Sequence, residues 1–384
     1  MSDPIYLDNN ATTRVAPEVF EAMRPYLDTL YGNAFSMYRF GGQLGAVLNT
    51  AREQVAALLG AMPEEIVFTS GGTESDATAV WSALRAQPDK RHIVTTRVEH
   101  PAVLSLCTHL QTQNYSVTFL PVDEQGRIGL NALEAALQRD TALVSMMYAN
   151  NESGVIFPIA EAAAIAGARG IPFHTDAVQA VGKLPVNLAE LPVDYLALSG
   201  HKLHAPKGVG ALYVRRGVKF RPFLLGGHQE RGRRAGTENV AAIVALGKAA
   251  ELAAAHMDEE NTRVRALRDC LEAGLLAAVP DAVVNGDRKN RIPNTLNIAF
   301  KHIEGEAILL LLDRMGVCAS SGSACTSKSL EPSHVLRAMG VPFTHVHGSV
   351  RFSLSRYTTQ EEIDFVLREL PPLVARLREL SPFR

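Results

Sequence analysis

Short apolar runs alternate with alanine- and leucine-rich stretches over the first half of the chain. Six runs predict strands, at residues 65–69, 92–96, 116–121, 142–148, 172–176 and 195–199. Between them, residues 46–59, 130–137 and 159–168 carry apolar positions three or four residues apart, the spacing of an amphipathic helix. Strands that alternate with helices indicate an α/β fold with a mostly parallel central sheet covered on both faces.

The last third of the chain has a different pattern. A long helical stretch at residues 239–276 precedes strand-like runs at 282–284, 295–300 and 350–353 and helices at 305–314 and 360–380. This pattern predicts a smaller α+β domain. We place the large domain at residues 15–260 and the small domain at residues 1–14 and 261–384. No linker rich in Ser, Gly or Pro separates them, so we expect the two domains to pack firmly.

Composition narrows the choice of partners. The 384 residues include 38 Lys plus Arg and 40 Asp plus Glu, for a net charge of −2, which argues against nucleic acid or an anionic membrane held by bulk charge. No secretory signal is visible, and Lys248 and Glu251 interrupt the longest apolar tract, so no membrane span is expected. The four scattered cysteines indicate free thiols in a reducing cytoplasm.

The first polar motif is Ser70-Gly-Gly-Thr-Glu74, which follows a predicted strand and opens a helix. At Gly72 the backbone can approach an anion closely, and the free N–H groups of the helix start point toward it. The hydroxyl of Thr73 adds a donor. The motif predicts a phosphate site, although a flexible strand–helix turn has the same composition.

The second motif, Ser199-Gly-His-Lys202, also follows a predicted strand. A lysine at a strand end in a sheet crevice loses solvation, which lowers its pKa and suits it to form an imine with a carbonyl compound. An ordinary surface lysine is the alternative, and Lys207 is a rival for the role.

Three further polar positions follow strands of the same predicted sheet. Asp176 could pair with a protonated pyridine nitrogen, or cap a helix. Asn150 and Asn151 could supply amide donors or serve only the turn. His100 could stack on a planar ring, transfer protons, or be structural. Together with the phosphate and lysine motifs, these residues describe one pyridoxal phosphate site.

Three more residues are candidates for binding or catalysis. Thr237, in a glycine–threonine turn after the basic residues 231–234, is a possible second phosphate ligand. Cys325 lies in a small, polar segment at 320–329 that predicts an exposed, reactive thiol, whereas Cys107, Cys270 and Cys318 lie in apolar surroundings that predict burial. Arg351, inside an apolar strand, needs an anion, either a substrate carboxylate or an internal salt bridge.

With these residues assembled, the chain resembles the cysteine desulfurases of the class V aminotransferase group, and is most similar to the NifS type. The motifs that carry the resemblance run in family order across nearly the whole chain: Tyr6-Leu-Asp-Asn-Asn-Ala-Thr-Thr13, Ser70-Gly-Gly-Thr-Glu74, Val98-Glu-His-Pro101, Ala149-Asn-Asn-Glu152, His174-Thr-Asp-Ala-Val-Gln179, Ser199-Gly-His-Lys202, Arg234-Ala-Gly-Thr237 and Ser320-Ser-Gly-Ser-Ala-Cys325. The NifS type is indicated by the stretches at residues 227–234 and 330–334.

The resemblance implies a fold type I pyridoxal phosphate enzyme that is a homodimer with active sites at the subunit interface. It implies conversion of L-cysteine to L-alanine, with the sulfur held as a persulfide on Cys325. That sulfur would pass to an iron–sulfur scaffold protein, in the NifS case for nitrogenase maturation, in the cytoplasm. No nucleic acid or membrane partner is implied.

The resemblance also implies a role for each cofactor residue. Lys202 would hold the cofactor as an imine and shuttle protons, Asp176 would pair with the pyridine nitrogen, and His100 would stack on the ring. Gln179 and Asn151 would contact the phenolic oxygen side. The phosphate would be bound by Gly72, Thr73, Ser199, Gly200 and His201, joined by Thr237 of the partner subunit.

On the substrate side, Arg351 would clamp the carboxylate, Asn33 and Asn151 would add contacts, and Cys325 would attack the sulfur. No intrinsic metal is implied, although Cys325 could be a transient iron–sulfur ligand. The sequence departs from the family at residues 32–38, where Gly-Asn-Ala-Phe-Ser-Met-Tyr replaces Gly-Asn-Pro-Ser-Ser-x-His, and at Ala77, where many members have asparagine. We expect this departure to affect the shape of the entrance to the site and some of its substrate contacts.

Three rival functions remain at this point. A selenocysteine lyase on the same fold depends less on a thiol nucleophile, because selenium leaves more easily than sulfur. A small-substrate aminotransferase needs no loop thiol, so Cys325 argues against it. A non-catalytic sulfur or cluster-binding protein would have no use for Lys202, Asp176 and His100.

Overall fold

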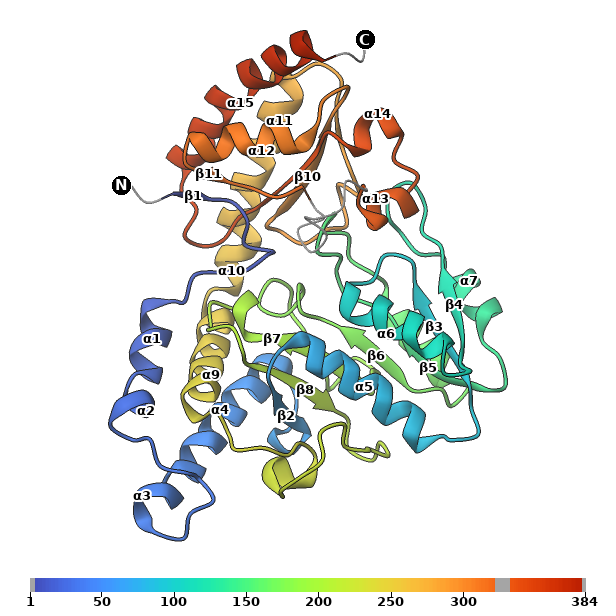
Figure 1. Ribbon diagram of the computed structural model, residues 1–384, viewed down its shortest axis with the longest axis vertical. Helices are drawn as coiled ribbons and strands as arrows, with labels where there is room; N and C mark the ends of the chain where they lie inside the picture. Colours follow the sequence, from blue (N-terminus) through green and yellow to red (C-terminus); the bar gives the residue numbers. More distant parts are fainter. Residues whose placement is uncertain (1–3, 322–331, 382–384) are drawn as a thin grey trace.

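A seven-stranded sheet forms the larger part of the molecule (Figure 1), in a computed structural model that describes residues 4–321 and 332–381. The strand order is β2-β8-β7-β6-β5-β3-β4, and every pairing is parallel except the two made by β8, which is antiparallel to both neighbours. The strands are β2 (Ile66–Thr69), β3 (His92–Thr96), β4 (Ser116–Leu120), β5 (Thr141–Ser145), β6 (Phe173–Asp176), β7 (Tyr195–Ser199) and β8 (Gly210–Val214). The predicted α/β class is confirmed; β8 is a strand that the prediction did not include.

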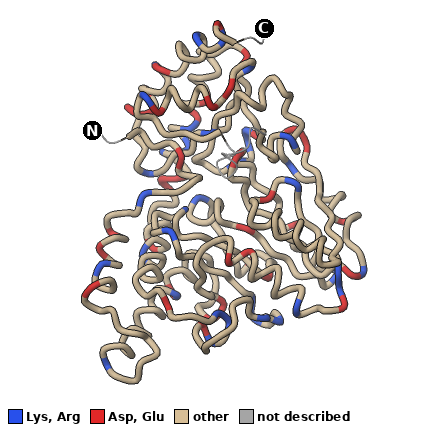
Figure 2. Tube along the Cα trace, viewed as in Figure 1, with Lys and Arg blue, Asp and Glu red and all other residues tan. Residues whose placement is uncertain are grey.

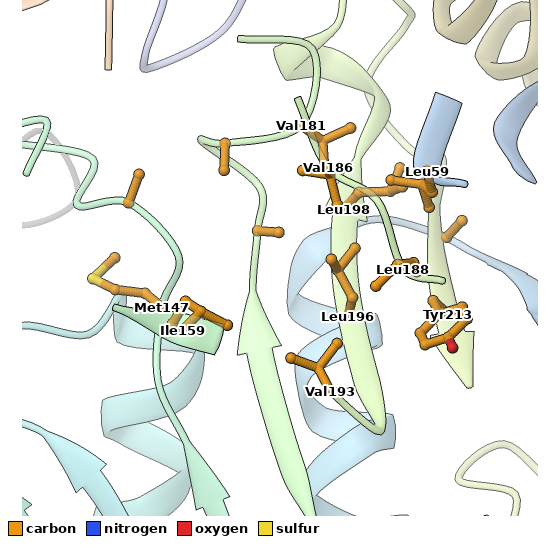
Figure 3. Close-up of a cluster of buried hydrophobic side chains, with 14 of the residues drawn as sticks. Leu59, Met147, Ile159, Val181, Val186, Leu188, Val193, Leu196, Leu198 and Tyr213 are labelled. Carbon is orange, nitrogen blue, oxygen red and sulfur yellow. The ribbon is translucent and has the colours of Figure 1, made fainter. Parts of the chain in front are cut away.

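Helices cover both faces of this sheet because alternate strand residues point to opposite sides. On β2, Val67 packs with α5 (Gly72–Ala86) and α6 (Pro101–Gln111), whereas Ile66 and Phe68 pack with α4 (Leu44–Leu59), α8 (Ile159–Gly167) and α9 (Val240–Ala255). Figure 3 shows the second face at β7 and β8, where Leu196, Leu198 and Tyr213 meet buried aliphatic side chains.

A smaller antiparallel sheet lies above the large one in Figure 1 and carries the C-terminal helices. Its order is β12-β10-β9, formed by β9 (Ala282–Val284), β10 (Thr295–Phe300) and β12 (Ser349–Ser353). It packs with α11 (Arg265–Ala278), α12 (Gly305–Arg314) and α15 (Gln360–Leu380) around a separate apolar cluster. We call these elements the small region.

The N-terminal segment joins the small region. Strand β1 (Ile5–Tyr6) pairs in parallel with β11 (Val317–Cys318), so the first described residues lie beside residues more than three hundred positions later. The exact domain boundaries at residues 14/15 and 260/261 stay a prediction.

The expected elements are present with small shifts at their ends. The predicted strand at 142–148 ends early, at Ser145, and the predicted helical stretch at 239–276 is divided by α10 (Met257–Glu259) and a π-helical turn at Glu260–Val264. The remaining helices are α1 (Pro17–Met23), α2 (Pro25–Asp28), α3 (Arg39–Gly42), α7 (Leu130–Ala136), α13 (His334–Ala338) and α14 (Phe343–Val346), with 3-10 turns at Pro63–Glu65, Gly200–Lys202 and Gln229–Gly232.

Charged residues of both signs are interspersed along the chain (Figure 2). In the described residues, a single helix long and apolar enough to cross a membrane does not occur; the bent pair Val240–Ala255 and Met257–Ala278 passes that test of length and composition only when taken together.

Candidate active site

A cavity of about 370 Å³ lies where the carboxyl ends of the parallel strands face the small region. Its volume is that of an ordinary small-molecule site. Most of the predicted site residues line it: Gly72, Thr73, His100, Asn151, Asp176, Gln179, Ser199, His201, Lys202 and Arg351. We call this cavity the cleft. Its sheet wall consists of the lining residues of the seven-stranded-sheet region, and its small-region wall consists of Arg351 of β12. His334 lines the cleft from α13, and Asn10 and Ala11 line it from the N-terminal segment.

One end of the sheet wall has the features of an anion cradle. Gly72 begins α5, and a Cβ atom at this position would lie 2.9 Å from Cγ2 of Val178, so a larger residue would not fit. Thr73, Ser199 and His201 surround the same end of the cleft. Burial lowers the pKa of His201 to about 4, so the imidazole is a neutral hydrogen-bonding group at pH 7. Backbone N–H groups at a helix start with hydroxyl donors are a typical phosphate environment.

Lys202 faces the cleft from the 3-10 turn that follows β7. Its ammonium group donates to the main-chain carbonyls of Asn10 and Ala11, the second at 2.7 Å. Lys207 is exposed and does not line the cleft. The geometry therefore favours Lys202 as the nucleophilic lysine.

The floor of the sheet wall holds buried carboxyl groups. Asp176, at the end of β6, accepts a hydrogen bond from the Val178 N–H at 2.9 Å, and Asp76 lies behind it with one oxygen that has no hydrogen-bond partner among the described residues. Burial raises the pKa of both groups, most strongly that of Asp76. His174, whose pKa burial lowers to about 3, places Nε2 3.4 Å from Asp76 Oδ1. This floor would accept a protonated ring nitrogen.

His100 begins α6 and lines the cleft beside Asp176. Its Nδ1 accepts a hydrogen bond from the Ala102 N–H at 3.1 Å, which leaves Nε2 to carry the proton. Burial lowers the pKa of this histidine, while Asp176 opposes the shift. A neutral imidazole at this place can contact a planar ligand and exchange a proton.

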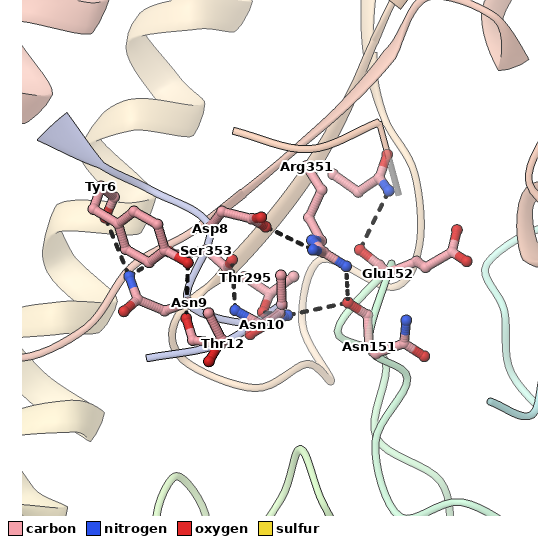
Figure 4. A network of polar contacts seen from close by, with 12 residues as sticks. Tyr6, Asp8, Asn9, Asn10, Thr12, Asn151, Glu152, Thr295, Arg351 and Ser353 are labelled. Carbon is pink, nitrogen blue, oxygen red and sulfur yellow. Dashed lines mark hydrogen bonds and ion pairs between the residues drawn. The ribbon is translucent and has the colours of Figure 1, made fainter. Parts of the chain in front are cut away.

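A network of polar contacts that includes Asn10, Asn151 and Arg351 borders the cleft (Figure 4). Gln179 Nε2 donates to the Asn10 carbonyl at 3.0 Å, and Asn10 Nδ2 donates to the Asn151 carbonyl at 3.1 Å. The side-chain oxygen of Asn151 is buried and has no hydrogen-bond partner among the described residues. Gln179 and Asn151 thus lie where the predicted ligand would meet them.

Arg351 makes an internal salt bridge and also lines the cleft. Its guanidinium pairs with Asp8 at 2.7 Å and donates to the Asn151 carbonyl at 2.9 Å, so the internal salt bridge exists. The side chain also lines the cleft, and its Nε atom has no hydrogen-bond partner among the described residues. A ligand carboxylate at this wall would compete with Asp8 for the guanidinium.

Four of the predicted residues that the structure describes do not line the cleft. Asn150 is buried and serves the turn: its Oδ1 accepts from the N–H groups of Glu152 and Ser153, and its Nδ2 donates to the Val98 carbonyl. Thr237 is exposed and lies in a separate cavity, next to the Arg234–Glu74 ion pair of 2.8 Å. Asn33 is exposed before α3, where its side chain accepts a hydrogen bond from the Phe35 N–H. Gly200 is buried and packs closely against Val209: a Cβ atom at this position would lie 2.9 Å from a methyl group of Val209.

The cysteines differ partly from the prediction. Cys107 is buried as expected, and burial raises its pKa to about 12. Cys270 and Cys318 are only partly buried, so the prediction of burial was wrong for them. Cys325 lies outside the described residues. Within residues 4–321 and 332–381, a group of three or more His, Cys, Asp or Glu side chains that could hold a metal ion is not found.

Four polar lining residues had no predicted role: Asn10, Asp76, Glu152 and His334. Ser333 donates a hydrogen bond to Glu152, and burial raises the pKa of that carboxyl to about 7. His334 Nε2 lies 3.0 Å from the Glu99 carbonyl. Asn10, Glu152 and His334 lie within sequence segments that carry the family resemblance, and Asp76 follows such a segment by two residues. Their position in or beside these segments is the sequence feature that could have predicted them.

Comparison with known proteins agrees with this geometry. The model of the family described as Aminotransferase class-V matches residues 5–366. Relatives include a cysteine desulfurase of Trichormus azollae, 64% identical over 99% of this chain and 95% of its own length. Cysteine desulfurase NifS of Azotobacter vinelandii is 62% identical over 99% and 94%.

Two solved structures extend the likeness to the fold. A NifS-like protein superposes with a TM-score of 0.92 at 39% identity, covering 97% of this chain and all of that one. SspA in complex with cysteine superposes with a TM-score of 0.82 at 33% identity, covering 92% and 100%. The chain belongs to the aminotransferase class-V family.

Proposed function

We propose that this protein is a pyridoxal phosphate-dependent cysteine desulfurase that converts L-cysteine to L-alanine and holds the sulfur as a persulfide on Cys325. The observation that carries the proposal is one cleft that combines Lys202, the buried Asp176 and Arg351. An amine nucleophile, a partner for a ring nitrogen and a carboxylate clamp together suit an amino-acid substrate. Relatives of more than 60% identity named cysteine desulfurase support the choice of reaction.

The cleft fits the proposed cofactor in shape and in chemistry. Gly72 presents bare backbone to the cleft, since a Cβ atom there would lie 2.9 Å from Val178 Cγ2, and the lining residue Asp76 has a buried oxygen with no hydrogen-bond partner among the described residues. Gly72, Thr73, Ser199 and His201 would hold the phosphate, Asp176 the ring nitrogen, and Gln179 and Asn151 the phenolic oxygen side. When bound, pyridoxal phosphate supplies an electron sink that activates the substrate.

The side chains of the cleft would then divide the remaining work. Arg351 holds the substrate carboxylate, and Lys202 Nζ moves a proton to and from the substrate carbon. The substrate amine takes the thiol proton, because the neutral His100 already carries its proton on Nε2 and can donate it. The Cys325 sulfur forms an S–S bond as the substrate C–S bond breaks, and the electron pair stays with the three-carbon fragment, which gains a proton to become alanine.

The proposal includes a homodimer in which Thr237 of the partner subunit completes the phosphate site. Two observations support it. Thr237 is exposed and outside the cleft of its own chain, and the buried Arg52–Glu230 pair and the partly buried Arg234–Glu74 pair hold its segment against α4 and α5. Dilution that separates subunits should then weaken cofactor binding by mass action. A monomer that retains the cofactor tightly would contradict this arrangement.

The proposed cellular role is sulfur supply to an iron–sulfur scaffold protein in the cytoplasm, with nitrogenase maturation as its destination. The 62% identity to cysteine desulfurase NifS of Azotobacter vinelandii supports that destination. Transfer of ³⁵S from the persulfide to a purified cluster scaffold tests the acceptor.

Incubation of the purified holoenzyme with L-cysteine tests the reaction. We expect alanine to form and mass spectrometry to map the persulfide to Cys325. Cys325→Ala should bind cofactor and cysteine normally but release almost no alanine, while Cys107→Ala, Cys270→Ala and Cys318→Ala should keep desulfurating. Near wild-type alanine formation by Cys325→Ala would overturn the thiol mechanism and favour selenocysteine lyase activity, and pyruvate with a transferred amino group would identify an aminotransferase.

A further inference from the structure

A second buried lysine lies behind the cleft, and the proposed reaction makes no use of it. Lys183 is 6% exposed and follows the β6 motif by a single turn of chain. Within the described residues, its ammonium makes one side-chain hydrogen bond, to Gln179 Oε1 at 3.4 Å. Burial of an ammonium group is costly unless it is paired, so this placement calls for a physical explanation.

The two neighbours of the Gln179 amide determine its orientation. A lysine ammonium can only donate, so the amide atom that faces Lys183 must be oxygen. A main-chain carbonyl can only accept, so the atom 3.0 Å from the Asn10 carbonyl must be nitrogen. Both contacts require the same orientation, and one Nε2 hydrogen remains for a ligand in the cleft that Gln179 lines.

Lys183 is also connected to Lys202 through the same atoms. The Asn10 carbonyl accepts from both Gln179 Nε2 and Lys202 Nζ. Both lysines border a cavity of about 20 Å³, enough for one water molecule. The other titratable or charged side chains that line this cavity are His204, His256, Glu260 and Arg356. Burial lowers the pKa of Lys183 to about 8 and Glu260 opposes the shift, so at pH 7 the group is mostly an ammonium donor.

We propose that Lys183 is a positioning residue that fixes the Gln179 amide with its nitrogen available to the cleft. The amide N–H can then donate a hydrogen bond to an oxygen of the ligand at this edge of the site. The inference rests on the proposed function, because in a pyridoxal phosphate site that oxygen is the phenolic one. Without Lys183, the amide is held only by the Asn10 carbonyl, which Lys202 Nζ also contacts. Rotation of the amide would then present its carbonyl to the cleft and repel such an oxygen.

The affinity of the apo protein for pyridoxal phosphate tests this proposal in a double-mutant cycle. Lys183→Met keeps the volume and removes the donor, and we expect it to weaken binding about 5- to 10-fold, the equivalent of one net hydrogen bond. In a Gln179→Leu background the same change should have no further effect. The exposed Lys207→Met is the matched control and should bind as the wild type does.

Equal affinity of Lys183→Met and wild type, or an equal loss in both backgrounds, would overturn the inference. A merely structural role would lower the melting temperature and weaken binding whether or not Gln179 is present. NMR of ¹⁵N-glutamine-labelled apo protein decides the point without cofactor. The Gln179 side-chain hydrogens should have dispersed shifts and exchange slowly with solvent in the wild type, and in Lys183→Met they should exchange faster and shift toward the positions of a free glutamine amide. If wild-type protein binds no pyridoxal phosphate, the proposed function fails, while unchanged NMR signals in Lys183→Met would refute the role of Lys183.

Discussion

The two walls of the cleft hold their charged side chains in different ways. On the sheet wall, burial raises the pKa of Asp176 and Asp76, and Lys202 donates to two main-chain carbonyls. On the small-region wall, Arg351 is already paired with Asp8 at 2.7 Å. The buried carboxyl groups of the sheet wall therefore favour a ligand group that carries a positive charge. At the small-region wall, a ligand carboxylate must compete with Asp8 for the Arg351 guanidinium.

This difference predicts two kinds of variant. Changes in the sheet wall should remove the cofactor or its chemistry altogether, because Lys202 and Asp176 would contact the cofactor itself. Changes in the small-region wall should alter substrate affinity by degrees, because Asp8 and a substrate carboxylate would share one guanidinium.

The largest expected effect comes from Lys202→Ala. Without the amine, the protein should lose covalently held cofactor and fall in alanine formation by about 10³-fold or more. Borohydride reduction followed by peptide mapping should place the cofactor on Lys202 in the wild type. Lys207→Ala, which removes an exposed lysine outside the cleft, should retain the adduct and the activity. Cofactor mapped to Lys207 would contradict the comparison of the walls.

An intermediate effect is expected at the other wall. Arg351→Ala should raise the KM for L-cysteine about 10- to 100-fold, since charge-assisted hydrogen bonds contribute about 1.5–3 kcal/mol each. The visible spectrum of the bound cofactor should not change. Steady-state kinetics with absorbance of the resting enzyme measure both quantities.

The matched variant Asp8→Asn should act in the opposite direction. It removes the competitor and leaves the guanidinium in place, so the KM should fall several-fold. If Asp8→Asn raises the KM as Arg351→Ala does, the ion pair only orients the arginine and the competition does not occur.

Much of the sheet wall could be predicted because parallel strands bring their carboxyl ends to one edge. Residues 70–74, 174–179 and 199–202 are far apart in sequence, yet each follows a strand, and the structure assembles them. Arg351 was harder to assign, because the sequence does not reveal that Asp8, 343 residues earlier, supplies its carboxylate.

The remaining misses have the same origin in long-range contacts. Asp76 on α5 lies next to His174 on β6, a contact between distant parts of the chain. Strand β8 lies antiparallel between β2 and β7, and no local periodicity indicates this position. The exposure of Cys318 follows from β11 being a two-residue strand paired with β1, although its neighbours are apolar. Asn33 was assigned through the resemblance, and within one chain it stays remote from the cleft residues; its substrate role stays a prediction.

The smallest expected effect concerns a carboxyl behind the sheet wall. Glu99 Oε1 accepts from the Thr96 hydroxyl at 2.7 Å and from the Met147 N–H at 3.0 Å, and Oε2 is buried with no hydrogen-bond partner among the described residues. Burial raises the pKa of Glu99 to about 8 from its usual 4.5. The folded protein therefore binds this proton more tightly than the unfolded chain does, so the free energy of unfolding should fall as pH rises from about 4.5 through 8.

Glu99→Gln should remove this part of the pH dependence. The amide oxygen can keep both hydrogen bonds of Oε1, and its NH₂ replaces the protonated oxygen, so the variant imitates the neutral acid at every pH. Urea unfolding of wild type and variant at pH 5 and pH 8.5 measures the difference. We expect equal stability at pH 5 and an advantage of roughly 1–3 kcal/mol for Glu99→Gln at pH 8.5. A constant difference between the two proteins at both pH values would mean that Glu99 is ionised in the folded state and that the sheet wall, like the small-region wall, already holds a paired charge.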